Sequence, residues 1–137
     1  MPNIHRNLCY LRTISFTLFC LMLATPAFSD TVGYFKQDDV LEPDKTRNNI
    51  VLIDVRTPAE YNTGRVPTAI NIPLAELSYR LDQVITYKGK NIVVYCRSGR
   101  RARIAARIIL QATDIQQVYF LMGDMNLWLA NNRPLER

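Results

Sequence analysis

One short segment of the chain combines a nucleophile with a cluster of cations. Residues 96–101 read Cys-Arg-Ser-Gly-Arg-Arg, and they lie between an apolar β-branched run at 91–95 and an amphipathic stretch at 100–111. At such a strand-to-helix turn, free N–H groups, the helix dipole and nearby guanidinium groups stabilise a thiolate. Gly99 permits a turn in which successive N–H groups point inward at an anion. We therefore expect Cys96 to be the nucleophile of an anion-binding loop.

Two other interpretations of this segment are less favoured. An isolated cysteine is most often a buried structural residue, but three arginines within five residues of Cys96 favour a reactive thiol. A basic turn could also bind nucleic acid, but a chain that we expect to be exported, with a net charge of +3 once residues 1–29 are removed, gives that little support. The one histidine is His5, so we expect no imidazole base at Cys96, whose reactivity must depend on its electrostatic surroundings.

The rest of the chain alternates strand and helix patterns. Alternation of this kind predicts an α/β fold, with a small parallel β-sheet flanked by helices on both faces. Ligands of such sheets bind beyond the carboxyl ends of the strands, which is where Cys96 lies. Residues 31–49 are polar, and we expect irregular structure or a short helix there. The predicted strands are 50–55, 69–72, 91–95 and 117–121. One predicted helix begins at Pro73 and has an apolar stripe of Leu74, Leu77, Leu81 and Val84. Two further helices are predicted over 100–111 and 126–131.

The first 29 residues have the composition of a secretory signal. Arg6 and Arg12 precede an apolar run at 14–24, and the small residues Ala27 and Ser29 follow it. This order predicts a signal peptide over residues 1–29, cleaved near Ala27 to Ser29. An uncleaved membrane anchor is the alternative, but a span needs about 20 mostly apolar residues, and this run is shorter.

Cleavage at that point would leave one domain, residues 30–137, with a net charge of +3. It would remove Cys9 and Cys20, so Cys96 would be the single cysteine and no internal disulfide could form. We expect this domain to be a periplasmic monomer without a stable membrane span.

Three blocks of sequence, the last of which includes the cysteine loop, follow one another along the chain. Residues 52–61 contain Asp-Val-Arg and a following Glu, residues 64–73 read Gly-Arg-Val-Pro-Thr-Ala-Ile-Asn-Ile-Pro, and residues 93–101 contain the cysteine loop. In this order and spacing they resemble the rhodanese family, and in particular its small single-domain exported members of the phage-shock type. A weaker fourth block is residues 121–128. The resemblance covers roughly residues 33–135.

The resemblance implies a thiosulfate sulfurtransferase. Cys96 would be the catalytic residue, taking sulfane sulfur from thiosulfate or polysulfide as a persulfide and passing it to cyanide or a thiol acceptor. No metal and no organic cofactor would be required, and no nucleic acid would be bound. The implied donor-binding residues are Arg97, Ser98, Gly99, Arg100 and Arg101, and the implied structural supports are Asp54, Arg56 and Glu60. Because Arg56 and Glu60 are four residues apart, we expect them to pair.

Four residues depart from the family pattern, and three alternative functions stay open. Asp124 replaces the second glycine of a turn that the family places near the active-site loop, so we expect it to affect substrate fit. The alternatives are a persulfide carrier or polysulfide-binding protein, a partner-binding module, and a cysteine phosphatase or arsenate reductase. Phosphatase loops are one residue longer, with arginine at the sixth position after the cysteine, where this chain has Ala102. The other departures are Arg65 for His, Thr68 for Gly and Ala102 for Ser.

Overall fold

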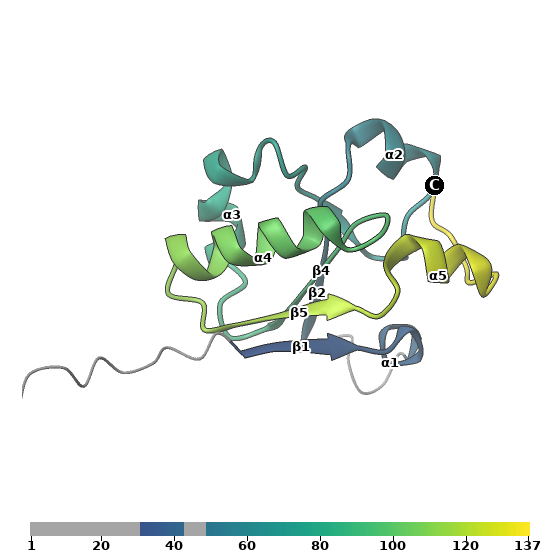
Figure 1. Ribbon diagram of the computed structural model, residues 1–137, viewed down its shortest axis with the longest axis horizontal. Helices are drawn as coiled ribbons and strands as arrows, with labels where there is room; N and C mark the ends of the chain where they lie inside the picture. Colours follow the sequence, from purple (N-terminus) through teal and green to yellow (C-terminus); the bar gives the residue numbers. More distant parts are fainter. Residues whose placement is uncertain (1–30, 43–48) are drawn as a thin grey trace, which may run out of the picture.

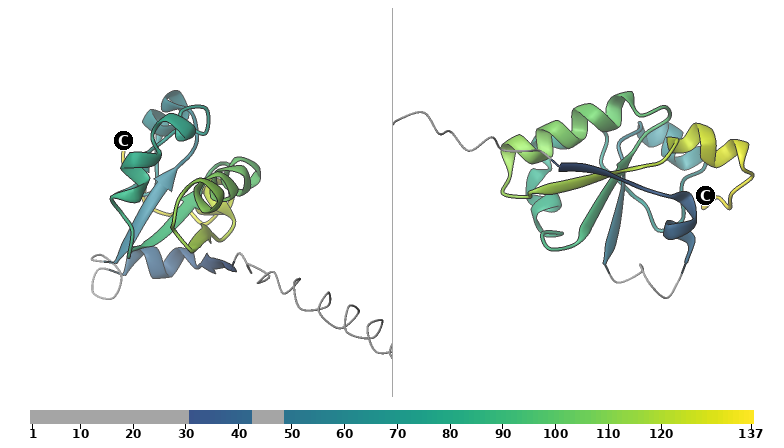
Figure 2. Two further views of the ribbon diagram at one scale, coloured as in Figure 1. Left: turned by 90° about the vertical axis from the view of Figure 1, so that its left-hand side faces the viewer. Right: turned by 60° about the horizontal axis from the view of Figure 1, so that its bottom comes forward.

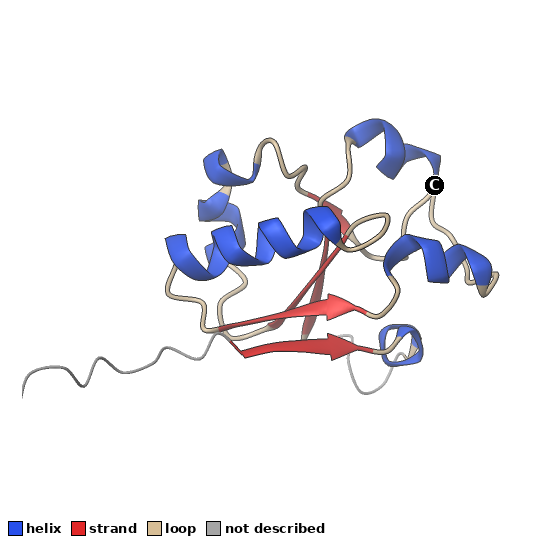
Figure 3. Ribbon diagram, in the orientation of Figure 1, coloured by secondary structure: helices blue, strands red, loops and turns tan. Residues whose placement is uncertain are grey.

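The computed structural model describes residues 31–42 and 49–137, and Figures 1 and 3 show their arrangement. The predicted signal peptide at residues 1–29 lies outside the described residues. The strands are β1 (Thr31–Phe35), β2 (Ile50–Asp54), β3 (Ile70–Asn71), β4 (Asn91–Tyr95) and β5 (Gln117–Leu121). The helices are α1 (Gln37–Leu41), α2 (Pro58–Thr63), the 3-10 turn η1 (Leu77–Tyr79), α3 (Leu81–Ile85), α4 (Arg100–Ala112) and α5 (Asp124–Ala130).

The five strands form one sheet in the order β1-β5-β4-β2-β3, and every neighbouring pair is parallel. This confirms the predicted α/β fold. β4 lies at the centre of the sheet, so the loop that follows it opens at the middle of the carboxyl edge. Figure 2 shows α4 running alongside the sheet from two further directions.

Alternate residues of β4 and its continuation enter two separate cores. Ile92, Val94 and Cys96 pack on the face covered by η1, α3 and α4. Val93 and Tyr95 pack on the opposite face with Met125 and Trp128 of α5, and with residues of α1. Both faces of the sheet are therefore covered by helices, as the continuous apolar pattern of this strand predicts. Tyr95 faces a helix, and Trp128 belongs to the core.

Two predicted elements differ in the structure. Residues 31–35 were expected to be irregular, but they form β1, which pairs only with β5 at the edge of the sheet. The single helix expected from Pro73 is divided into η1 and α3 at Arg80, whose φ of −119° and ψ of 20° are not helical. The Arg80 guanidinium donates to the backbone oxygen of Asn71 at 3.3 Å. This bond joins the break to β3, so the apolar stripe still packs on the sheet.

α2 begins with a capping box. The Thr57 hydroxyl accepts a hydrogen bond from the N–H of Glu60, and the Glu60 carboxylate accepts one from the N–H of Thr57. Pro58 occupies the first helical turn, where its missing N–H costs nothing. This short helix positions the Glu60 carboxylate.

No helix among the described residues is long and apolar enough to cross a membrane.

Candidate active site

The proposed nucleophile lies at the start of the turn between β4 and α4. Tyr95 ends the strand and Arg100 begins the helix, so residues 96–99 form the whole connection. Cys96 is only 1% exposed, whereas Arg97, Ser98 and Arg100 are exposed around it. The thiol is therefore at the base of the loop, and its neighbours are at the surface.

The loop backbone is turned so that the N–H group of Gly99 points at the sulfur. Gly99 adopts φ = 84°, a left-handed conformation that favours glycine. Its N–H donates to the Cys96 sulfur at 3.1 Å. The carbonyls of Cys96 and Arg97 point the other way and accept hydrogen bonds from the N–H groups of Met125 and Asn126, at 3.1 and 3.0 Å. The first turn of α5 therefore fixes the loop from behind.

Several loop N–H groups remain available to a ligand. Within residues 31–42 and 49–137, those of Arg97, Ser98, Arg100 and Arg101 have no protein acceptor. Successive free N–H groups around one point form an anion-binding site. The structure thus brings together the thiol and the donor-binding residues expected from the sequence.

Arg101 is held against the thiol by a residue from another helix. Its two terminal nitrogens donate to the two carboxylate oxygens of Glu60 at 2.7 and 2.8 Å. This bidentate bond to Arg101 lowers the pKa of Glu60 to about 2, well below its usual range. The pKa of Arg101 is raised by the same bond to Glu60 and further by the neighbouring Cys96 sulfur. Glu60 therefore fixes a permanent positive charge beside the nucleophile.

The expected pair between Arg56 and Glu60 is wrong. Arg56 binds Asp54 instead, with its Nε 3.0 and 2.9 Å from the two carboxylate oxygens and its Nη2 2.6 Å from one of them. Both side chains are buried, and a buried charge needs a partner of this geometry. Arg56 also donates to the backbone oxygen of Gly64 at 2.8 Å. This pair connects the end of β2 to the segment after α2.

Asp124 contributes to the site in a way that the sequence did not reveal. Its Oδ1 accepts a hydrogen bond from the backbone N–H of Cys96 at 2.7 Å, and the residue is 8% exposed. Burial raises the pKa of Asp124, and hydrogen bonds from Cys96 oppose that rise. The signal was the Gly-Asp pair in place of the family's Gly-Gly, which pointed to an altered turn but not to a carboxylate beneath the nucleophile.

The other three departures lie away from the thiol or in the core. Arg65 stacks on the ring of Tyr61 at 4.5 Å and binds Glu136 at 2.6 Å, which attaches the last residues of the chain to the domain. Thr68 has φ = 67°, which explains why the family prefers glycine there. Ala102 is fully buried on the inner face of α4.

No set of three His, Cys, Asp or Glu side chains within the described ranges is arranged to hold a metal ion.

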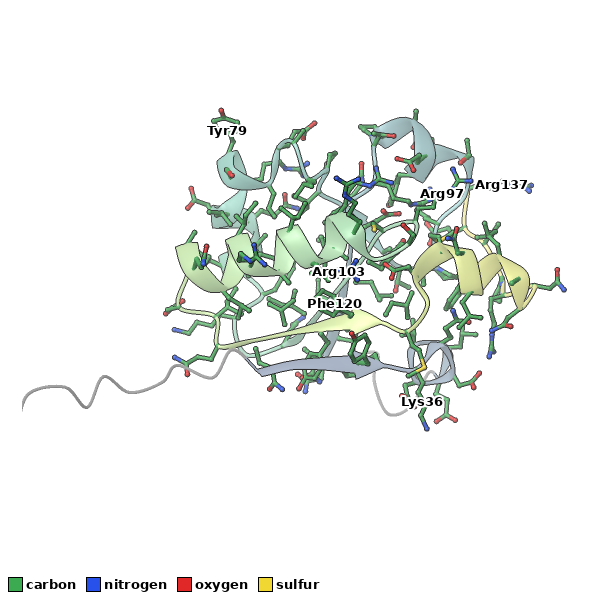
Figure 4. The ribbon with its side chains drawn as sticks, viewed as in Figure 1. Lys36, Tyr79, Arg97, Arg103, Phe120 and Arg137 are labelled. Atoms are coloured by element: carbon green, nitrogen blue, oxygen red, sulfur yellow. The ribbon has the colours of Figure 1, made fainter. Side chains whose placement is uncertain are left out.

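Arg97 of the loop and Arg103 of α4, both labelled in Figure 4, add positive charge at the end of the sheet where α5 begins. The site is therefore a cysteine loop at the carboxyl end of the central strand of a small parallel sheet.

The family model of the rhodanese-like domain matches residues 37–131. The chain belongs to the rhodanese-like domain family.

Curated relatives carry the same domain. The chain is 31% identical over 87 residues to a sulfurtransferase of Allochromatium vinosum, a match covering 64% of this chain and 78% of the relative. It is also 31% identical over 131 residues to the adenylyltransferase and sulfurtransferase MOCS3 of Drosophila sechellia, covering 88% of this chain. The chain spans only 29% of the length of that second relative.

Solved structures share the fold. A rhodanese-related protein from Thermoplasma volcanium is 26% identical and superposes with a TM-score of 0.60, covering 76% of this chain and 97% of that protein. A Rhodopseudomonas palustris protein described as a possible tyrosine phosphatase is 22% identical, with a TM-score of 0.64 and coverage of 77% and 85%. At that identity the second match shows the fold alone.

Proposed function

We propose that this protein is a sulfurtransferase that carries sulfane sulfur as a persulfide on Cys96. The observation that carries the proposal is the loop geometry: the N–H of Gly99 donates to the Cys96 sulfur at 3.1 Å, with further free N–H groups on the same loop. These groups stabilise negative charge on the first or second sulfur without a metal or an organic cofactor. The sulfurtransferase of A. vinosum supports the same reaction class.

The proposed reaction has two steps. The Cys96 thiolate attacks the outer sulfur of thiosulfate, the sulfur–sulfur bond of the donor breaks, and sulfite leaves with the bonding electron pair. A nucleophilic acceptor, cyanide or a thiolate, then attacks the outer sulfur of the persulfide. Cys96 leaves as a thiolate, and the product is thiocyanate or an acceptor persulfide. This is covalent, ping-pong catalysis.

The charges of the site suit a small anionic donor. Arg97 and Arg100 are exposed beside the loop, and Arg101 is held next to the thiol by Glu60. Such a cluster raises the local concentration of anions such as thiosulfate or polysulfide. We propose that the protein acts as an exported, periplasmic monomer of the phage-shock type, on the basis of the signal-like first 29 residues.

A carrier that passes sulfur from polysulfide to another protein would use the same persulfide, so it differs from this proposal only in donor and acceptor.

A phosphatase or arsenate reductase is less favoured. Those enzymes hold a tetrahedral oxyanion with an arginine at the sixth position after the cysteine, but here Ala102 occupies that position and is fully buried.

The test is the intact mass of the purified chain after incubation with thiosulfate. Cys9 and Cys20 are replaced by serine in every sample, so that Cys96 is the one thiol. We expect the mass to rise by one sulfur atom, cyanide to remove that sulfur as thiocyanate, and a Cys96→Ser variant to gain nothing. Uptake from polysulfide but not from thiosulfate would favour the carrier. No uptake from either donor, together with hydrolysis of an aryl phosphate, would overturn the proposal.

A further inference from the structure

A buried carboxylate lies directly behind the nucleophile. Oδ1 of Asp124 is 2.7 Å from the Cys96 nitrogen, and Oδ2 is 3.0 Å from the point where a Cβ on Gly99 would lie. The N–H of that same Gly99 is bonded to the Cys96 sulfur. The carboxylate therefore lies against both ends of the loop that encloses the thiol, and hydrogen bonding with Cys96 lowers the pKa of Asp124 against the effect of burial.

The charged groups around Asp124 come from two helices. On α4, an Nη of Arg103 is 3.3 Å from the same Gly99 Cβ position, which places this cation beside the carboxylate. Arg101 of α4 faces the thiol instead, and its charge is shared with Glu60 of α2. On α5 itself Asp124 is the only charged residue. Burial thus favours the protonated form of the Asp124 carboxylate, and the Arg103 cation partly opposes this effect.

Asp124 also adopts a backbone conformation that only a few residue types tolerate. Its φ is 51°, in the left-handed region that disfavours residues other than glycine, asparagine and aspartate. Fixing the loop alone would require only an uncharged acceptor for the Cys96 N–H. A carboxylate supplies that acceptor and also a site for a proton, next to a thiol that has no histidine in the described residues.

We propose that Asp124 accepts the proton of the Cys96 thiol during sulfur uptake and returns it when the sulfur leaves. This inference rests on the proposed persulfide function. In the first step the S–H bond of Cys96 breaks, the proton moves to the Asp124 carboxylate, and the sulfur attacks the donor as sulfite departs with its electron pair. In the second step the acceptor takes the outer sulfur, and the released Cys96 thiolate recovers the proton from Asp124. No oxidant or reductant is needed.

The consequence is a characteristic dependence of thiol reactivity on pH. When a thiol and a carboxylate share one proton, a fixed fraction exists as thiolate and carboxylic acid, and this fraction does not change with pH until the pair gains or loses a proton. The rate of alkylation then shows a plateau on the acidic side, in addition to the usual rise in alkaline solution. A thiol without such a partner shows only the rise.

The test compares the wild-type chain with Asp124→Asn, both carrying Cys9→Ser and Cys20→Ser, in alkylation by uncharged iodoacetamide across pH. Asparagine accepts the Cys96 N–H bond and tolerates left-handed backbone, but it takes no proton. We expect Asp124→Asn to lose the plateau and to react about tenfold or more slowly than wild type near pH 6, a loss of the size of general base catalysis. Near pH 9, where hydroxide can take the proton in place of Asp124, we expect the two rates to converge.

The opposite result is equally clear. A carboxylate that only repels the thiolate would make Asp124→Asn as fast as wild type near pH 6, or faster, and that outcome overturns the proposal. If Asp124→Asn fails to fold, Arg103→Gln provides the second test. Removal of this cation must move the acidic limit of the plateau to higher pH, and an unchanged profile overturns the proposal as well.

Sulfur uptake is measured on the same samples. A plateau without sulfur uptake from thiosulfate or polysulfide would contradict the sulfurtransferase function and leave the role of Asp124 standing. Sulfur uptake by a wild-type chain that lacks the plateau would support the sulfurtransferase function and overturn the proposed role of Asp124.

Discussion

Cys96 is surrounded by groups that come from distant parts of the chain. The N–H of Gly99 is local, but Arg101 is fixed by Glu60, which is 41 residues away in sequence, and the Cys96 N–H is bound by Asp124, 28 residues away. The residue types in the loop were enough to predict a nucleophile and its N–H groups. The resemblance indicated that Glu60 and Asp124 matter to the site, but their partners, Arg101 and the Cys96 N–H, were not predictable, because nothing in the local pattern shows which helix faces the loop.

The fixed charge of Arg101 leads to the first prediction. Arg101→Gln removes the guanidinium that lies beside the thiol, so we expect kcat/KM for thiosulfate to fall about a hundredfold, the size of effect seen when one preorganised donor is lost. Steady-state thiocyanate formation measures it. Arg107→Gln is the matched control, since Arg107 is exposed on the same helix, and we expect less than a threefold effect. Equal losses in the two variants would show that only net charge matters.

Thr68 is a second residue whose conformation is unfavourable. A β-branched residue at φ = 67° is strained, and relief of left-handed strain exceeds the backbone entropy that glycine costs. We expect Thr68→Gly to stabilise the protein by about 0.5 kcal/mol in urea unfolding. Thr86→Gly, at φ = −60°, is the control and should destabilise it. Destabilisation by both changes would mean that the Thr68 side chain makes a compensating contact.

At the level of elements, α2 and α4 are joined by one ion pair. The capping box fixes Glu60 on α2, and Glu60 in turn binds Arg101 at the start of α4. α5 fixes the other side of the loop through the N–H groups of Met125 and Asn126. The loop is thus held between three helices, and its shape depends on their mutual packing.

This ion pair makes stability depend on pH. The pKa of Glu60 is about 2 in the folded protein, below its usual 4.5, so its contribution is fully present above about pH 4.5 and is lost as pH falls toward 2. We expect Glu60→Gln to destabilise the protein at pH 7 and to make urea unfolding less dependent on pH across that acidic window. Glu76→Gln, which breaks an exposed pair with Arg80, is the control with little effect. A Glu60→Gln protein with the full acid sensitivity of wild type would contradict this assignment.

The elements also show what local sequence patterns can and cannot predict. β2 and β4 were predictable because each is a run of apolar, mostly β-branched residues. Such a run is typical of a strand in a parallel sheet that has helices on both faces. β1 was not, because it is an edge strand defined only by its pairing with β5, far along the chain. The break at Arg80 was hidden for a similar reason: the apolar stripe continues through it, and only the bond to β3 reveals it.

For the whole molecule, strand order sets a gradient of stability. β4 has a partner on each side, whereas β1 and β3 each have one and lie at the edges. We expect backbone hydrogen exchange, followed by mass spectrometry, to be slowest in β4 and fastest among the strands in β1 and β3. Within the cysteine loop, we expect the N–H groups of Cys96 and Gly99, which donate to Asp124 and to the Cys96 sulfur, to exchange more slowly than those of Arg97 and Ser98, which have no acceptor among the described residues. Equally slow exchange in β1 and β4 would contradict this gradient.

The same strand order has a consequence for how the chain acquires its structure. Among the described residues, β1 is the first strand and its only neighbour is β5, the last strand, and β5 also completes the pairing of β4. The sheet therefore cannot close until residues 117–121 have been synthesised. Pairing over such a long sequence separation is slow. Until β5 is available, β1 has no partner in the described sheet and β4 lacks one of its two neighbours.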